Sequence, residues 1–108
     1  MFIAHEIALQ IVRALRSVVD RIARRDPALA DQIRRAASSV ILNVVEGNRR
    51  VGQDRLHLFR IAAGSAAEID GAIEVATAWG YVEETAVIEA KALVDRELGL
   101  LWGLTRRR

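Results

Sequence analysis

Residues 35–47 read Arg-Ala-Ala-Ser-Ser-Val-Ile-Leu-Asn-Val-Val-Glu-Gly, and this segment carries the strongest structural signal in the chain. Polar side chains recur in and just after it at steps of 4, 4, 3 and 4 residues, namely Arg35, Ser39, Asn43, Glu46 and Arg50. Apolar residues recur beside them at the same spacing. Because residues three and four apart share one side of an α-helix, the pattern predicts a helix with adjoining polar and apolar stripes.

Helical spacing continues on both sides of this segment. We expect four helices at about residues 3–25, 27–49, 54–79 and 83–104, followed by a basic tail over residues 105–108. Asp26-Pro27 predicts the start of the second helix, because aspartate caps helix N-termini and proline is tolerated at the first helical position. Gly80 predicts the end of the third helix. No segment shows the alternation of a β-strand.

Short turns between helices of similar length make neighbouring helices run antiparallel. We therefore expect residues 1–108 to form a single all-α domain, an antiparallel up-down-up-down four-helix bundle. No apolar run approaches the roughly 20 residues of a membrane span. The N-terminus lacks a secretory pattern and the chain has no cysteine, so we expect a cytoplasmic protein that does not enter membranes.

Small residues in the third predicted helix, Ala-Ala-Gly-Ser-Ala-Ala-Glu at 62–68, would let a neighbouring helix approach closely. Our hypothesis is that Asn43 and Glu46 of the second helix meet Ser65 or Glu68 in a partly buried hydrogen-bond network, with Arg35 or Arg50 balancing the carboxylates. The predicted network consists of Arg35, Ser39, Asn43, Glu46, Ser65 and Glu68. The alternative is that the stripe is simply solvated.

Charge is unevenly distributed along the chain. Residues 1–60 hold eleven arginines against six acidic residues, whereas residues 61–105 hold two basic residues against eight acidic ones. One interpretation is a basic surface for nucleic acid, and the other is charge pairing between helices or subunits. The candidate nucleic-acid-binding residues are Arg13, Arg16, Arg24, Arg49, Arg50 and Arg55. Because no aromatic residues are interleaved with them, binding is expected to be to the backbone and to weaken with salt.

The fourth predicted helix holds more large apolar residues near its end than one helix face accommodates. The excess favours a self-association surface, because tryptophan and tyrosine are typical interface anchors. The alternative is a wide face buried in a small core. The candidate interface residues are Trp79, Tyr81, Leu101 and Trp102.

Signatures of catalysis and of metal binding are absent from the sequence. There is no cysteine, no Gly-x-Ser-x-Gly segment and no Walker spacing. His5 and His57 do not stand in the Glu-x-x-His pairs that hold two metals in helical bundles. We therefore expect no catalytic residues, no metal ion, no cofactor and no enzymatic activity.

Residues 35–47, followed by Phe59, Ala63-Gly64-Ser65, Glu68 and Gly80-Tyr81, resemble the four-helix-bundle proteins encoded by intervening sequences of large-subunit (23S) ribosomal RNA genes. The resemblance covers about residues 30–82. It implies an up-down four-helix bundle, a ring-shaped homo-oligomer that is most often a homopentamer, and no established catalytic activity.

A protein related to that family, the accessory variability determinant of diversity-generating retroelements, is a basic pentameric ring that binds nucleic acid and a reverse transcriptase. By similarity, the expected partners here are further copies of the chain, RNA or DNA, and a reverse transcriptase or other protein. The expected function is that of a nucleic-acid or ribonucleoprotein accessory protein. The alternative is a protein–protein adaptor with no nucleic-acid role.

Overall fold

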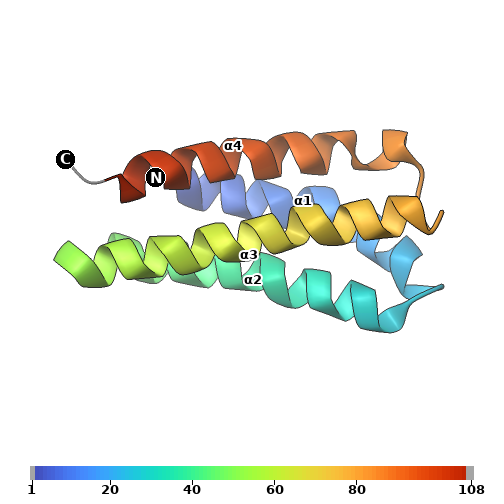
Figure 1. Cartoon of the computed structure of the whole chain (residues 1–108), viewed down its shortest axis with the longest axis horizontal. Coiled ribbons are helices and arrows are strands. Elements are labelled where there is room, and N and C mark those ends of the chain that lie inside the picture. Colours follow the sequence, from blue (N-terminus) through green and yellow to red (C-terminus); the bar gives the residue numbers. More distant parts are fainter. Residues whose placement is uncertain (1, 107–108) are drawn as a thin grey trace.

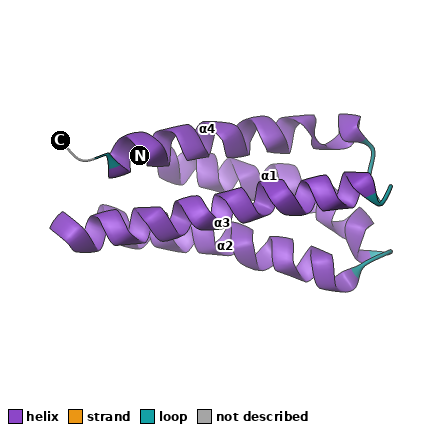
Figure 2. Ribbon diagram, viewed as in Figure 1, coloured by secondary structure: helices purple, strands orange, loops and turns teal. Residues whose placement is uncertain are grey.

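Four long α-helices lie side by side along one axis in the computed structural model, which describes residues 2–106 (Figure 1). They are α1 (Ile3–Ala23), α2 (Pro27–Asn48), α3 (Gly52–Ala78) and α4 (Ile88–Thr105), and a short 3-10 helix, η1 (Glu84–Val87), precedes α4. The described residues contain no strand (Figure 2). Consecutive helices point in opposite directions, so the predicted all-α, antiparallel four-helix bundle is confirmed.

Two of the helix ends form as their residues predict. The Asp26 side chain accepts a hydrogen bond from the Leu29 N–H at 3.0 Å, and Pro27 occupies the first turn of α2. After α3, Gly80 has a φ of 77°, and the Tyr81 N–H donates to the Ala76 carbonyl at 2.9 Å. This is a Schellman motif, in which a glycine in the left-handed region lets the last carbonyls find donors.

The start of the last helix differs most from its prediction. A single helix from about residue 83 was expected, but η1 occupies 84–87 and α4 begins at Ile88. The tighter turn accompanies the burial of both Val82 and Val87 in the core. Smaller differences occur at α1, which ends at Ala23, and at α3, which begins at Gly52. The predicted basic tail lies partly outside the described residues.

Each helix packs against two neighbours: α1 and α3 both contact α2 and α4. The molecule measures 43 × 22 × 22 Å. On α1, apolar residues that step by 4, 4, 3 and 4 along the helix are all buried, namely Ile7, Ile11, Leu15, Val18 and Ile22. The contact between α2 and α3 is the most extensive, because α3 places alanines against its neighbours and their small side chains allow close approach.

No helix within residues 2–106 has both the length and the apolar character needed to cross a bilayer.

Candidate functional site

A hydrogen-bond network joins α2 to α3 through serine and asparagine side chains. The Ser65 hydroxyl on α3 donates to the Ser39 Oγ on α2 at 2.8 Å. The Asn43 Nδ2 donates to the same Oγ at 3.1 Å and to the Ser39 carbonyl at 2.8 Å. All three side chains are half-buried. The structure therefore brings together the three uncharged members of the predicted network, with Ser39 as the link between the helices.

The charged members of the predicted network bond elsewhere. Glu68 accepts a hydrogen bond from the Gln32 side chain at 3.1 Å, which adds a second connection between α2 and α3. Arg35 pairs with Asp31 one turn earlier, at 3.5 Å, and does not balance Glu68. Glu46 accepts a hydrogen bond from Arg50 at 2.8 Å, so Arg50 balances this carboxylate as predicted. The predicted hydrogen bond from Glu46 to Ser65 or Glu68 is not among those of the described residues, and Arg35 does not balance Glu68. Both residues lie on the exposed side of α2 and pair with a partner one helical turn away.

Gly47 and Phe59 form a close contact at the end of the α2–α3 interface. A Cβ atom at Gly47 would lie 2.7 Å from the Phe59 Cε1, so only glycine fits there without a shift. The Phe59 ring is fully buried, stacks on Phe2 with centroids 6.0 Å apart, and lies beneath the Arg55 guanidinium at 4.8 Å. Glycine at 47 and phenylalanine at 59 therefore depend on each other, a pairing that sequence spacing alone did not reveal.

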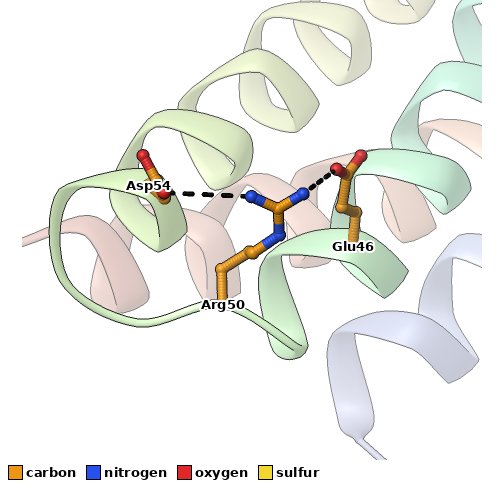
Figure 3. Close-up of polar contacts among 3 residues, drawn as sticks. All are labelled: Glu46, Arg50 and Asp54. Carbon is orange, nitrogen blue, oxygen red and sulfur yellow. Dashed lines mark hydrogen bonds and ion pairs between the residues drawn. The ribbon is translucent and has the colours of Figure 1, made fainter.

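Two of the arginines in the turn between α2 and α3 hold that turn together. Arg50 lies between two carboxylates, 2.8 Å from Glu46 and 3.8 Å from Asp54 (Figure 3). The Arg55 Nη1 donates to the Gly47 carbonyl at 3.3 Å and to the Asn48 carbonyl at 3.4 Å. These carbonyls belong to the last turn of α2, where the helix itself supplies no donor, and the Gly47 carbonyl also accepts from the Arg50 N–H at 3.1 Å. Arg50 and Arg55, two of the candidate nucleic-acid-binding residues, therefore already have partners within the chain.

The three candidate arginines on and directly after α1 lack such partners. Arg13, Arg16 and Arg24 are exposed, and none forms an ion pair within residues 2–106. Their spacing places them on one side of the helix, over a length of about 16 Å. Arg49 is also exposed and forms no ion pair within residues 2–106. It follows the end of α2, which in the antiparallel bundle lies beside the start of α1, whereas Arg24 follows the end of α1 (Figure 1). The six candidate arginines therefore do not form one site.

Trp79 and Tyr81 form a stacked pair where α3 ends. Their ring centroids are 6.5 Å apart with an interplanar angle of 15°. The Tyr81 hydroxyl donates to Asp26 at 3.3 Å, and the Arg25 guanidinium lies 5.7 Å from the tyrosine ring. Burial, followed by the neighbouring Asp26 carboxylate, raises the pKa of Tyr81. Trp79 remains 69% exposed, so its surface is available to a partner.

Trp102 and Leu101, predicted together as interface residues, have opposite environments. Leu101 is 0% exposed inside its own bundle, so it offers no surface to another chain and that assignment was wrong. Trp102 is 67% exposed and lines a groove of about 760 Å³ between α3 and α4. Because a helix turns 100° per residue, neighbours in sequence face different ways, and only one of the two belongs to the core.

The core contains one charged residue that the sequence reasoning missed. Glu97 on α4 is 0% exposed, and both its carboxylate oxygens lack a hydrogen-bond partner among the described residues. Burial in apolar surroundings raises the pKa of Glu97 to about 8. A signal was present, since Ala90, Val94, Glu97 and Leu101 step by 4, 3 and 4 residues along one buried face.

Within the described part of the chain, no three histidine, aspartate or glutamate side chains gather as a metal site would require. The histidines are separate: His57 is exposed, and His5 is half-buried on α1.

Comparison with known proteins places this architecture in a family. A search of curated proteins gives no match. A crystal structure of a protein of unknown function from the S23 ribosomal protein family of Bacteroides thetaiotaomicron superposes with a TM-score of 0.84 at 17% identity, covering 96% of this chain and 99% of that one. At that identity the likeness shows a shared fold. The family described as 23S rRNA-intervening sequence protein matches residues 3–103. The chain therefore belongs to the 23S rRNA-intervening sequence protein family.

Proposed function

We propose that this chain is a non-enzymatic accessory protein that binds nucleic acid, free or in a ribonucleoprotein, and acts as a homo-oligomer. The observation that carries the proposal is the row of exposed, unpaired arginines on α1: Arg13, Arg16 and Arg24. Unpaired surface cations are free to replace the counterions of a phosphate backbone, and this exchange supplies most sequence-independent affinity. The family's link to ribosomal RNA genes supports the same assignment.

The ion pairs of α1 and α2 support nucleic-acid binding by these α1 arginines. Asp20 lies among these arginines on α1, but its carboxylate pairs with Arg34 of α2 at 3.5 Å. Arg35 and Arg50 are also paired. The remaining positive charge of the first half of the chain is therefore concentrated on α1, where a phosphate backbone can run along the helix.

The opposite side of the bundle supports self-assembly. Residues 61–105, which include most of α3 and all of α4, carry the excess of acidic residues. Because α1 and α2 lie opposite α3 and α4, the two sides of the bundle differ in charge, as a head-to-tail contact between copies requires. In the proposed assembly the arginines on α1 lie outside that contact and stay free for nucleic acid. A ring, and by family resemblance a homopentamer, is the proposed assembly. A reverse transcriptase is a proposed protein partner on the same ground.

Fluorescence anisotropy with labelled RNA and DNA across a salt series tests nucleic-acid binding. Replacing Arg13, Arg16 and Arg24 all by glutamine is expected to make the slope of log affinity against log salt shallower by about 2 to 3, since each lost phosphate contact contributes roughly 0.7 to 0.9. The matched control replaces Arg35, Lys91 and Arg96 with glutamine, which removes the same charge elsewhere. Equal losses in both variants, or wild-type affinity that ignores salt, would favour the protein–protein adaptor.

Light scattering after gel filtration tests assembly. The expected mass is a small multiple of the 12.0 kDa chain. A monomer at micromolar concentration would contradict the proposed ring.

A further inference from the structure

We propose that the groove between α3 and α4 binds single-stranded nucleic acid, with a base stacked on Trp102 and neighbouring phosphates held by Arg60 and Arg106. The inference rests on the proposed function and specifies its ligand, because it adds a second surface that selects unpaired strands. The row of arginines on α1 makes no such distinction, since both single and double strands carry phosphates.

The groove has the dimensions and composition of a binding site. Its volume of about 760 Å³ is within the usual range for ligand sites. Arg60 and Ala63 line it from α3, Leu98 and Trp102 line it from α4, and Arg106 lines it from just beyond the end of α4. It therefore combines an apolar floor, one aromatic ring and two cations. The sequence did not suggest this, because Arg60 and Trp102 are far apart in the chain and only the antiparallel packing of α3 and α4 brings them together.

The two exposed tryptophans differ in what covers their rings. Trp79 stacks on Tyr81, so part of its aromatic surface is already used. Trp102 is exposed to nearly the same extent, but it stacks on no aromatic ring within residues 2–106. Every nucleobase has a flat face that stacks on such a ring, whatever its identity.

Two glycines leave open space next to Trp102. A Cβ atom added at Gly99 or Gly103 would meet no atom within 4 Å, so packing inside this chain does not require glycine at either position. Glycine weakens a helix interior. Gly99 lines the groove itself, one turn before Trp102. The absence of a side chain at Gly99 leaves room in the groove for a flat group beside the indole.

The arginines of the groove are available to anions. Neither Arg60 nor Arg106 forms an ion pair or a side-chain hydrogen bond within the part of the chain that the structure describes. Arg106 follows the last residue of α4, four residues after Trp102, and Arg60 lines the same groove from α3. Phosphates on either side of a stacked base would lie near these two cations. A duplex cannot use this arrangement, because its bases are already stacked on one another.

Binding of short single strands to Trp102→Ala and Trp79→Ala variants tests the inference. The probes are labelled oligo(U) and oligo(dT), which separate RNA from DNA as the ligand, and a labelled hairpin duplex. Trp102→Ala is expected to weaken single-strand binding roughly 5- to 100-fold and to leave duplex binding unchanged. Trp102→Phe should retain most of the affinity, since a phenyl ring still stacks. Trp79→Ala, the control of equal size and exposure, should bind single strands as the wild type does.

A joint Arg60→Gln and Arg106→Gln variant should lower the salt slope for single strands by about 1.4. Thermal melting and light scattering of each variant accompany these measurements, because the competing occupant of the groove is a second copy of this chain. Loss of assembly in Trp102→Ala, or equal affinities for Trp102→Ala and Trp79→Ala, would overturn the inference and leave the proposed function standing. Absence of binding by the wild type to both strands and duplex would overturn both.

Discussion

Replacing Glu97 with glutamine should remove a large pH dependence from the stability of this bundle. The carboxyl group is fully buried and its oxygens have no hydrogen-bond partner among the described residues. Its pKa is raised from 4.5 to about 8 by burial. Folding therefore favours the protonated acid, whereas the unfolded chain releases that proton at much lower pH.

The sign and size of the effect follow from proton linkage. Below pH 4.5 both states are protonated, and the folded state carries no penalty from Glu97. As the pH rises from there to about 8, the folded state holds a proton that the unfolded state has lost, so stability falls by about 1.4 kcal/mol per pH unit. The cumulative loss is about 3 kcal/mol at pH 7 and about 5 kcal/mol above pH 8.

Urea unfolding followed by circular dichroism, at fixed protein concentration between pH 4 and pH 8.5, measures this directly. Glu97→Gln keeps the shape of the side chain and cannot ionise, so it should match the wild type in acid and exceed it by about 3 kcal/mol at pH 7. Glu89→Gln changes an exposed acid on the same helix and should leave the pH profile unchanged. A constant difference between wild type and Glu97→Gln at every pH would refute the reasoning.

Three further substitutions test the packing of the bundle. Gly47→Ala should destabilise the bundle by about 1 kcal/mol in thermal or urea unfolding, because the clash with Phe59 outweighs the gain in helix propensity. Gly64→Ala adds a Cβ that meets nothing within 4 Å, so it should stabilise the bundle by up to about 1 kcal/mol. Equal stability of the two variants would contradict the close contact. Asp26→Ala should cost about 1–2 kcal/mol, since it removes the cap of α2 and the acceptor of the Tyr81 hydroxyl; unchanged unfolding would show that the cap contributes nothing. Ser65→Ala should cost about 1 kcal/mol, and a double-mutant cycle with Ser39→Ala should show coupling; additive effects would argue against the hydrogen bond.

Local chemistry predicted the fold class because each signal concerns residues close together in the chain. Apolar spacing on the first helix located its buried face, Asp26-Pro27 located the start of α2, and Gly80 located the end of α3. The polar stripe of residues 35–47 predicted that Ser39 and Asn43 share one side of α2, and in the structure Ser39 joins that side to Ser65. Each of these inferences needs only helical periodicity and the preferences of single residues at helix ends.

Which charged side chains pair with one another depends on the tertiary structure. A long arginine side chain reaches several acceptors, so the sequence could not show that Arg50 lies between two carboxylates while Arg13 has no partner in the described chain. Packing likewise decided that Glu97 is buried and that Trp102 faces a groove with Arg60. Helical spacing determines which residues share a face of one helix, but only the packing of α3 and α4 determines which faces of different helices meet.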